Sequence, residues 1–366
     1  MSDQAFMTRA LQLAGQGLYS THPNPRVGCV LVQDGRIVGE GWHRQAGTPH
    51  AEVHAIRAAG AQARGATAYV SLEPCSHHGR TPPCAQALLD AGVSRVVVAM
   101  QDPNPQVAGR GLERLRAAGI EVQLLDGALQ QQALELNAGF VKRMREGLPR
   151  VTAKLAMSVD GRTAMASGES QWITGPAARA DVQRLRARSS VIVSGADTVL
   201  LDGARLTVRA EQLDLPEPQK ALALQCPPMR VLVDSRHRVP FDAPFYQADN
   251  AWLASVQPPQ QPLPERTGLL LVPEREGHVD LHALLQLLAQ EHEANEVLVE
   301  AGARLCGAFL QAGLLDELVI YMAPKLLGSD ARPLFDLPLL HMAQAVDLHI
   351  TDIRAVGSDW RISCRL

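Results

Sequence analysis

The feature that most constrains this chain is a break near its middle, at Glu146-Gly147-Leu148-Pro149. On both sides of the break, short apolar runs alternate with helical patterns, which is typical of sheets covered by helices. A Gly and a Pro end the preceding helical pattern, and a new strand-like run begins at Arg150. Because 366 residues exceed what one hydrophobic core usually supports, we expect two α/β domains, residues 1–147 and 148–366.

In the first half, Val27–Val32 and Ile37–Trp42 flank Asp34-Gly35, a pattern that predicts a β-hairpin. The periodicity of the remaining residues predicts helices at Pro49–Ala59, Cys84–Ala91, Leu112–Ala118 and Ala128–Arg145, and strands at Ala66–Leu72, Val93–Met100 and Ile120–Leu125.

The second half predicts helices near Pro176–Ala187, Leu281–His292 and Ala303–Ala312, and strands at Arg150–Met157, Val191–Ser194, Arg230–Asp234, Gly268–Leu271, Glu296–Val299, Leu315–Met322, Asp347–Ile353 and Trp360–Leu366. Two Pro- and Gln-rich stretches, Leu213–Met229 and Val256–Thr267, are predicted to be surface loops. The sequence has no G-x-G-x-x-G motif, so it does not favour a Rossmann fold.

Charge and hydropathy narrow the class of protein. The formal net charge is −3, and acidic and basic residues are interleaved, so no basic track for nucleic acid is expected. The apolar runs are shorter than the ~18 residues that a membrane span needs. The N-terminus lacks the pattern of a secretory signal, so we expect a cytoplasmic protein whose six cysteines are thiols.

Three short elements carry residues suited to zinc, namely Pro49-His50-Ala51-Glu52, Pro74-Cys75 and Pro83-Cys84. A catalytic zinc site uses three His, Cys or carboxylate ligands and leaves a fourth position for water. We expect His50, Cys75 and Cys84 to be the ligands. Glu52, two residues after His50 at a helix start, is expected to act as general acid/base.

The spacing departs from the usual zinc-deaminase pattern, H-x-E followed by P-C-x-x-C, because eight residues separate Cys75 from Cys84. Three alternatives stay open on the residues alone: buried core side chains, a Cys75–Cys84 disulfide, and a structural zinc site closed by His77 or His78. Glu52 favours catalysis, because a structural zinc site has no need of it. In a deaminase, Glu52 would take a proton from water activated by zinc and return it to the departing ammonia.

The segment PCSHHGRTPPC (74–84) resembles the bifunctional deaminase/reductase family of riboflavin biosynthesis. The resemblance covers both halves of the chain and extends to Pro23-Asn24-Pro25, Gly41-Trp42-His43, Asp102-Pro103-Asn104-Pro105, Lys154–Ser158, Asp160-Gly161-Arg162, Ser170–Thr174, Gly195–Asp202 and Leu206–Arg209. It implies a three-layer, cytidine-deaminase-like domain followed by a dihydrofolate-reductase-like α/β domain, with Zn²⁺ and NADPH as cofactors. The chain departs from the family at Ser189-Ser190 and Gly203-Ala204, where no role is assigned.

The resemblance also implies the reactions. The first is hydrolytic deamination of 2,5-diamino-6-(5-phosphoribosylamino)pyrimidin-4-one. The second is NADPH-dependent reduction of the ribosyl chain, which gives 5-amino-6-(5-phosphoribitylamino)uracil. Asn24 and His43 resemble residues of the deaminase pocket, although a turn residue and a surface imidazole are their plain alternatives. His77, His78 and Arg80 lie between the two cysteines, where they would contact either the substrate phosphate or only solvent.

In the second half, motif positions imply contacts to NADPH from Ala156, Trp172, Thr198, Asp202, Gly302, Ala303, Arg304, Leu305, Cys306, Gly307 and Ala308. They imply contacts to the substrate from Ser170, Arg186, Leu206, Arg209 and Glu300. The residue types suit these roles, since arginines bind phosphates through paired hydrogen bonds and a carboxylate can hold sugar hydroxyls. The role of Lys154 stays open.

Two other functions compete with this interpretation. A deaminase of nucleic-acid bases with an accessory domain would need a basic, aromatic-lined track, which the sequence lacks. A zinc-stabilised binding protein would leave Glu52 without a role. The expected partner is therefore a small-molecule substrate, and the family resemblance implies a homo-oligomer.

Overall fold

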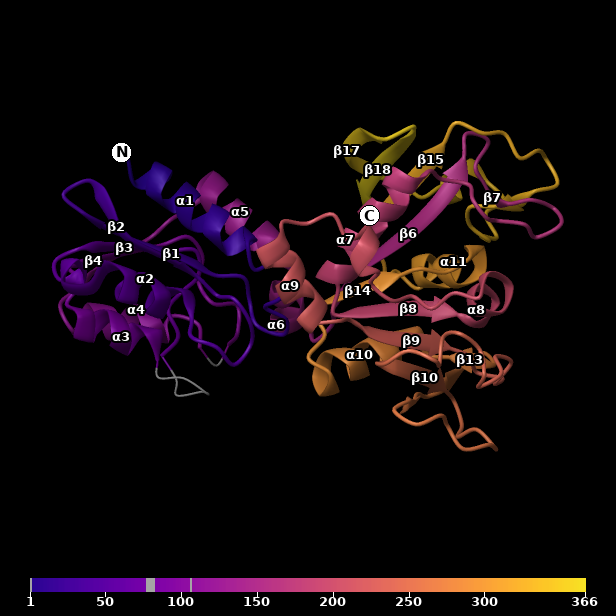
Figure 1. Ribbon diagram of the computed structural model, residues 1–366, viewed down its shortest axis with the longest axis horizontal. Helices are drawn as coiled ribbons and strands as arrows, with labels where there is room; N and C mark the ends of the chain where they lie inside the picture. The colour runs from indigo at the N-terminus through magenta and orange to yellow at the C-terminus, as the bar shows by residue number, and fades with distance from the viewer. Residues whose placement is uncertain (1, 77–82, 106) are drawn as a thin grey trace. The chain divides into compact units, whose positions relative to one another are not determined.

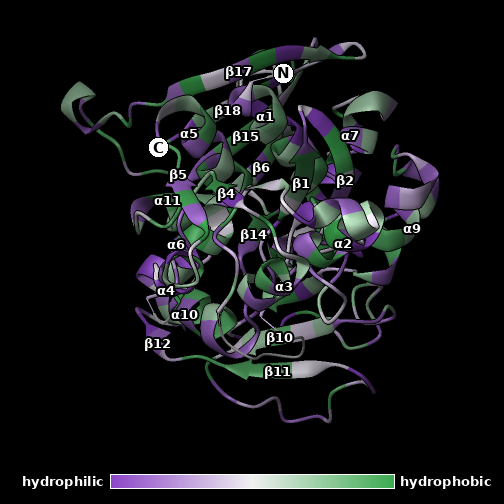
Figure 2. Ribbon diagram, turned by 90° about the vertical axis from the view of Figure 1, so that its left-hand side faces the viewer, coloured by the Kyte–Doolittle hydropathy of each residue, from purple (hydrophilic) through white to green (hydrophobic). Residues whose placement is uncertain are grey.

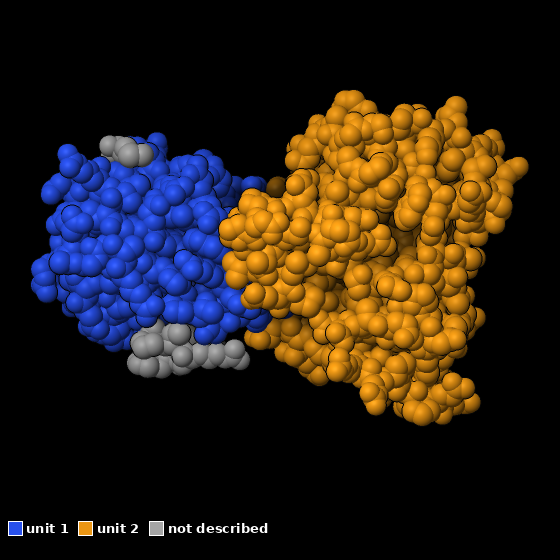
Figure 3. Space-filling view, viewed as in Figure 1, with its two compact units in different colours: residues 1–147 blue, residues 148–366 orange. Residues whose placement is uncertain are grey.

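The computed structural model describes residues 2–76, 83–105 and 107–366. The chain divides at Gly147 into two units, Met1–Gly147 (unit 1) and Leu148–Leu366 (unit 2), which Figure 3 colours separately. Each unit has hydrophobic clusters of its own.

Unit 1 is built on a five-stranded sheet of order β2-β1-β3-β4-β5. β1 is antiparallel to both of its neighbours, whereas β3, β4 and β5 are parallel. Its elements are α1 (Asp3–Gly15), β1 (Gly28–Gln33), β2 (Arg36–Trp42), α2 (Ala51–Ala59), η1 (Gly60–Ala63), β3 (Thr67–Val70), α3 (Cys84–Ala91), β4 (Arg95–Val98), α4 (Arg110–Ala117), β5 (Glu121–Leu124), α5 (Gly127–Leu136) and α6 (Ala138–Glu146).

Alternating side chains of the strands explain why unit 1 has three layers. In β1, Cys29 and Leu31 join the cluster formed by α2, α3 and α4, whereas Val30 and Val32 join the cluster of α1, α5 and α6. Figure 1 shows α1 and α5 on one face of the sheet and α2, α3 and α4 on the other. This confirms the predicted three-layer arrangement of unit 1. Figure 2 shows hydrophobic and hydrophilic residues together on α2, as expected of a helix with one buried side.

The hairpin between β1 and β2 forms as predicted, with positive φ at both Asp34 and Gly35. The predicted helix Ala128–Arg145, by contrast, is divided at Asn137 into α5 and α6. The buried Asn137 side chain accepts a hydrogen bond from the backbone N–H of Arg26 at 2.7 Å and donates to the Arg26 carbonyl at 3.0 Å. Asn137 therefore serves a distant loop, which the helical periodicity could not reveal.

Unit 2 contains a nine-stranded sheet of order β11-β10-β9-β8-β14-β6-β15-β18-β17. The strands from β11 to β15 are parallel, and β18 and β17 continue the sheet in antiparallel fashion. Its elements are β6 (Arg150–Ser158), β7 (Arg162–Ala164), α7 (Pro176–Arg188), β8 (Val191–Gly195), α8 (Ala196–Asp202), η2 (Ala210–Gln212), α9 (Glu217–Gln225), β9 (Met229–Val233), β10 (Ala251–Ser255), β11 (Gly268–Leu271), β12 (Glu274–Arg275), β13 (His278–Val279), α10 (Leu281–Glu291), β14 (Glu296–Val299), α11 (Ala303–Gln311), β15 (Glu317–Ala323), β16 (Arg332–Pro333), η3 (Met342–Gln344), β17 (His349–Val356) and β18 (Asp359–Arg365).

Helices cover both faces of this sheet. Residues of α7 and α8 pack in one cluster with Ile192 and Leu298, and residues of α10 and α11 pack in another with Val193 and Val299. Adjacent residues of β8 and β14 thus point to opposite, buried faces, as expected of parallel strands in an α/β sheet.

Several elements of unit 2 lie where the sequence predicted none, among them α8, α9 and β10. β10 escaped prediction, and α9 lies inside Leu213–Met229, which was predicted to be a loop. The prolines of this stretch suit a helix start: Pro216 is the N-cap residue of α9 and Pro218 lies in its first turn, where no backbone N–H is needed. Within the described part of the chain, no helix is long and apolar enough to cross a membrane.

Candidate active sites

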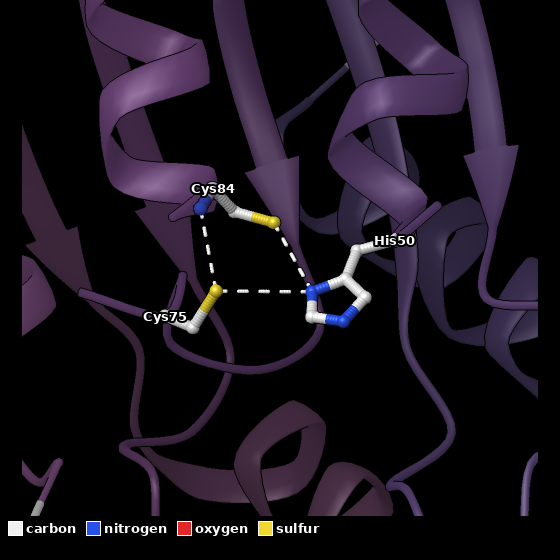
Figure 4. Close-up of side chains that lie close together, drawn as sticks. All are labelled: His50, Cys75 and Cys84. Carbon is white, nitrogen blue, oxygen red and sulfur yellow. Dashed lines mark hydrogen bonds between the residues drawn. The ribbon is translucent and has the colours of Figure 1, made fainter. Parts of the chain in front are cut away.

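Three elements of unit 1 bring the predicted zinc ligands together (Figure 4). His50 is the N-cap residue of α2, Cys84 is the first residue of α3, and Cys75 lies in the loop after β3. The Nδ1 atom of His50 lies 3.2 Å from Sγ of Cys84 and 3.7 Å from Sγ of Cys75. The three ligand atoms all lie within 4.8 Å of one another, so one metal ion could contact all of them.

The chemistry of these donors fits zinc, which binds imidazole nitrogen and thiolate sulfur. The backbone N–H of Cys84 donates to Sγ of Cys75 at 3.3 Å. Hydrogen bonds from Cys84 and His50 hold the pKa of the Cys75 thiol below its usual range. Because zinc binds the thiolate, this arrangement prepares Cys75 for the metal.

Glu52 lies in the first turn of α2 and is 3% exposed. Its Oε2 atom is buried and has no hydrogen-bond partner. Burial raises the pKa of Glu52, and the nearby Cys75 thiolate raises it further. A buried carboxylate oxygen without a partner beside three zinc ligands is what a zinc-activated water would satisfy.

Asn24 and His43, the two predicted pocket residues, lie next to this cluster. The amide nitrogen of Asn24 lies 3.0 Å from Nε2 of His43, and the rings of His43 and His50 meet edge to face with centroids 5.1 Å apart. His43 is 2% exposed, so it is not a surface imidazole. Burial and the neighbouring His50 lower the pKa of His43 to about 4. His77, His78 and Arg80 lie outside the described residues.

Unit 2 has a pocket of about 1970 Å³, which is about twice the volume of the largest ordinary small-molecule sites. It opens beyond the ends of the parallel strands β8, β9 and β14, next to Gly195, Val233 and Glu300. Ligands of open α/β sheets bind at this edge. The volume therefore suits a dinucleotide together with a second molecule.

A buried ion-pair cluster lies in the wall of this pocket. Arg186 donates two hydrogen bonds to the Glu300 carboxylate, at 2.6 and 3.0 Å, and a third to the Thr207 carbonyl at 2.8 Å. Nζ of Lys154 lies 3.9 Å from Glu300. Although burial alone would raise it, the charge and hydrogen bonds of Arg186 hold the pKa of Glu300 below its usual value. Glu300 is thus an oriented, ionised carboxylate at the pocket.

Most of the residues predicted for the reductase half line this one pocket. They are Ala156, Ser170, Trp172, Arg186, Thr198, Asp202, Leu206, Arg209, Glu300, Gly302, Ala303, Arg304, Leu305 and Ala308. Cys306 and Gly307 do not: Cys306 is buried in the core, where its thiol donates to the Ala301 carbonyl at 3.4 Å, and Gly307 packs against the backbone of Asp336. Both lie on the inner side of α11.

Sequence reasoning missed part of the pocket wall. Arg236, Arg238 and Arg275 line it, together with His278 and His282. They come from the segment after β9, from the β12–β13 pair and from the start of α10. A count of basic residues near predicted strand ends would have found Arg236 and Arg238, but β12 and β13 are too short to predict.

Family models match both units. Residues 1–100 match the cytidine and deoxycytidylate deaminase zinc-binding region, and residues 149–362 match the RibD C-terminal domain. The riboflavin biosynthesis protein RibD of Escherichia coli K12 is 56% identical, and the match covers 98% of each chain. The chain belongs to the RibD family.

Solved structures of RibD proteins agree with the fold. Acinetobacter baumannii RibD (form 1) has a TM-score of 0.90 at 46% identity, with 99% of this chain and 98% of that chain covered. A Thermotoga maritima protein described as a diaminohydroxyphosphoribosylaminopyrimidine deaminase/5-amino-6-(5-phosphoribosylamino)uracil reductase has a TM-score of 0.85 at 31% identity, with the same coverage. Like other RibD proteins, this chain is a bifunctional deaminase and reductase of riboflavin biosynthesis, with zinc and NADPH as its cofactors.

Proposed function

We propose that unit 1 deaminates 2,5-diamino-6-(5-phosphoribosylamino)pyrimidin-4-one and that unit 2 reduces the ribosyl chain of the product to give 5-amino-6-(5-phosphoribitylamino)uracil. The two activities for which the Thermotoga maritima relative is named support both substrates. The observation that carries the proposal for unit 1 is the buried, partnerless oxygen of Glu52 beside His50, Cys75 and Cys84. A zinc site of purely structural role would not need this carboxylate.

Zinc held by His50, Cys75 and Cys84 would supply a water molecule acidic enough to lose its proton near neutral pH. Glu52 is the residue that takes this proton and later delivers it to the departing amine. Its raised pKa suits both steps, because a carboxylate in a dry pocket is a stronger base and, once protonated, remains able to donate. Asn24 and His43 hold the pyrimidine, and His43 does so as a neutral imidazole.

NADPH would supply a hydride to C1′ of the ring-opened ribosyl imine. The residues of unit 2 bind and orient the two reactants. Arg186 fixes the Glu300 carboxylate, which accepts hydrogen bonds from the sugar hydroxyls. Arg209 lines the same pocket and suits the phosphate. The turn that begins at Gly302, at the N-terminus of α11, offers backbone N–H groups to the phosphates of the cofactor.

The decisive experiment supplies the diaminopyrimidinone phosphate with and without NADPH and identifies the products by mass. We expect the deaminated product alone without NADPH and the ribityl product with it. Glu52→Gln should retain one zinc per chain, release ammonia at least about 100-fold more slowly, and still reduce deaminated substrate supplied to it. Loss of zinc together with unfolding of unit 1 would instead indicate a structural metal.

We also propose that a second copy of the chain covers β17, which would make the protein a homo-oligomer. β17 is the edge strand of its sheet, and its side chains are largely exposed, including Ile350 and Ile353 at 53% each. Figure 2 shows hydrophobic stretches along β17. Unpaired strand edges with apolar side chains are typical surfaces of association.

The six cysteines, all free, support a reducing, cytoplasmic location.

Light scattering after gel filtration tests the oligomer. The unaltered chain should elute as a dimer or larger, and Ile353→Glu should lower its mass to that of a monomer. Leu271→Glu is the matched control, because Leu271 is 50% exposed on β11, the opposite edge strand. A monomeric mass for the unaltered chain at micromolar concentration would contradict the proposal.

A further inference from the structure

A carboxylate lies buried two residues before the proposed zinc ligand Cys75. Glu73 is 3% exposed, and its oxygens accept hydrogen bonds from four backbone N–H groups. Oε2 accepts from Asp102 at 3.1 Å and from Gly109 at 3.0 Å. Oε1 accepts from Gly111 at 2.9 Å and from Leu112 at 3.4 Å. Glu73 forms no ion pair with any residue that the structure describes, so backbone dipoles alone compensate its charge.

These donors come from two segments that otherwise have no role in the site. Gly111 and Leu112 belong to the first turn of α4, where backbone N–H groups lack partners within the helix. Asp102 and Gly109 belong to the loop before α4, which contains the Asp102-Pro103-Asn104-Pro105 motif. Oδ1 of Asp102 accepts a hydrogen bond from the N–H of Asn104 at 2.9 Å. This bond forms a local turn that bends the loop toward the Glu73 carboxylate.

The backbone on either side of Glu73 is held as well. The N–H of Glu73 donates to the Met100 carbonyl at 3.0 Å. The Pro74 carbonyl lies so close to Gly111 that a Cβ atom there would be 2.0 Å from its oxygen. The next residue is Cys75, whose carbonyl accepts from the N–H of Ala85 at 3.1 Å. The position of Sγ of Cys75 is thus set from one side by α3 and from the other by Glu73 and α4.

We propose that Glu73 is a positioning residue for zinc, which fixes the Cys75 loop against the start of α4 so that Sγ of Cys75 meets His50 and Cys84. The proposal rests on the proposed zinc site of unit 1. It gives the Asp102–Pro105 motif a function, namely to supply backbone donors to a carboxylate that the metal never touches. Groups behind a ligand commonly control how tightly a metal is held.

The test compares Glu73→Gln with Glu113→Gln in the full-length, zinc-loaded protein. Gln keeps the shape of Glu73 but turns an NH₂ group toward N–H donors. Glu113 lies in the first turn of the same helix but is exposed, so its variant removes an equal charge without disturbing the loop. Zinc release to a chromogenic chelator and the absorption spectrum of the Co²⁺-substituted protein are the readouts.

We expect Glu73→Gln to weaken zinc binding about 10- to 100-fold and to alter the Co²⁺–thiolate spectrum. Glu113→Gln should match the unaltered protein, and the reductase rate should be unchanged in both variants. Unchanged zinc release and an unchanged spectrum in folded Glu73→Gln would overturn the inference. An unaltered protein that binds no zinc would instead overturn the proposed zinc site itself.

If Glu73→Gln does not fold, Gly111→Ala tests the same contact from the other side, because the new methyl group would push on the Pro74 carbonyl without removing the carboxylate. Faster zinc release in this variant would support the inference. Release at the rate of the unaltered protein would count against it.

Discussion

Three buried carboxylates of this chain are compensated in three different ways, and the differences separate their roles. Glu300 is paired with Arg186, and Glu73 is surrounded by backbone N–H groups. Glu52 alone among these three has a buried oxygen with no partner. A buried charge is costly unless hydrogen bonds or an opposite charge compensate it. The oxygen without a hydrogen-bond partner therefore identifies the carboxylate that is free to bind a reactant.

The pH dependence of the stability of unit 1 tests the burial of Tyr69. The hydroxyl of Tyr69 donates to Oδ1 of Asp3 at 2.6 Å. Burial raises the pKa of Tyr69 from 10.0 to about 12, and the hydrogen bond to Asp3 adds to this shift. Below pH 10 the stabilising contribution of the neutral hydroxyl is complete. Between pH 10 and about 12 it is lost, because the unfolded chain ionises first.

We therefore expect the denaturant midpoint of unit 1 to fall over this pH range, and to fall less steeply in Tyr69→Phe. Equilibrium unfolding at about pH 9, 10, 11 and 12 measures the difference. Equal slopes for the two proteins would show that Asp3 does not hold the hydroxyl.

At the scale of elements, glycines in β2 determine where the catalytic helix lies. A Cβ atom on Gly41 would be 2.3 Å from the Ala51 carbonyl oxygen and 2.6 Å from the Ala55 nitrogen, and one on Gly39 would be 2.2 Å from the Ala55 carbonyl oxygen. α2 thus packs with its backbone directly on β2. Since α2 carries Glu52 and has His50 as its N-cap residue, this close packing determines the distance from both residues to the cysteines.

Gly41→Ala should push α2 away from β2. We expect a loss of about 1–3 kcal/mol in the stability of unit 1, together with weaker zinc binding. Gly15→Ala is the control, because a Cβ atom there has no neighbour within 4 Å. Denaturant unfolding and zinc titration of both variants provide the measurement, and equal zinc affinity would show that α2 tolerates the shift.

Sequence reasoning predicted most elements because their periodicity was strong, and it predicted the cluster of His50, Cys75 and Cys84 because each of these three residues follows a proline. What it could not predict depends on distant partners. Asn137 divides a helix because its side chain forms a hydrogen bond with Arg26. Glu73 accepts hydrogen bonds from backbone N–H groups between Asp102 and Leu112. Neither residue differs locally from an ordinary surface Asn or Glu. The part of the pocket wall formed by Arg275 and His278 was missed because a strand of two residues is too short to show an alternating pattern.

At the scale of the whole molecule, each unit has its own clusters of buried side chains, so the two should unfold separately. Zinc bound only in unit 1 stabilises only unit 1. In calorimetry we expect two transitions, and a chelator should lower the temperature of one by several degrees without moving the other. A single transition, or a shift of both by the chelator, would contradict this expectation.

The order of the strands in unit 2 has a consequence for how the chain is made. β6 is the first strand of this unit to be synthesised, yet its neighbours in the sheet are β14 and β15, which follow more than a hundred residues later. Unit 1, by contrast, pairs all of its strands within its own 147 residues. During translation the deaminase half can therefore fold before the partners of β6 have been synthesised, and the reductase half is the one that exposes an unpaired central strand for longer.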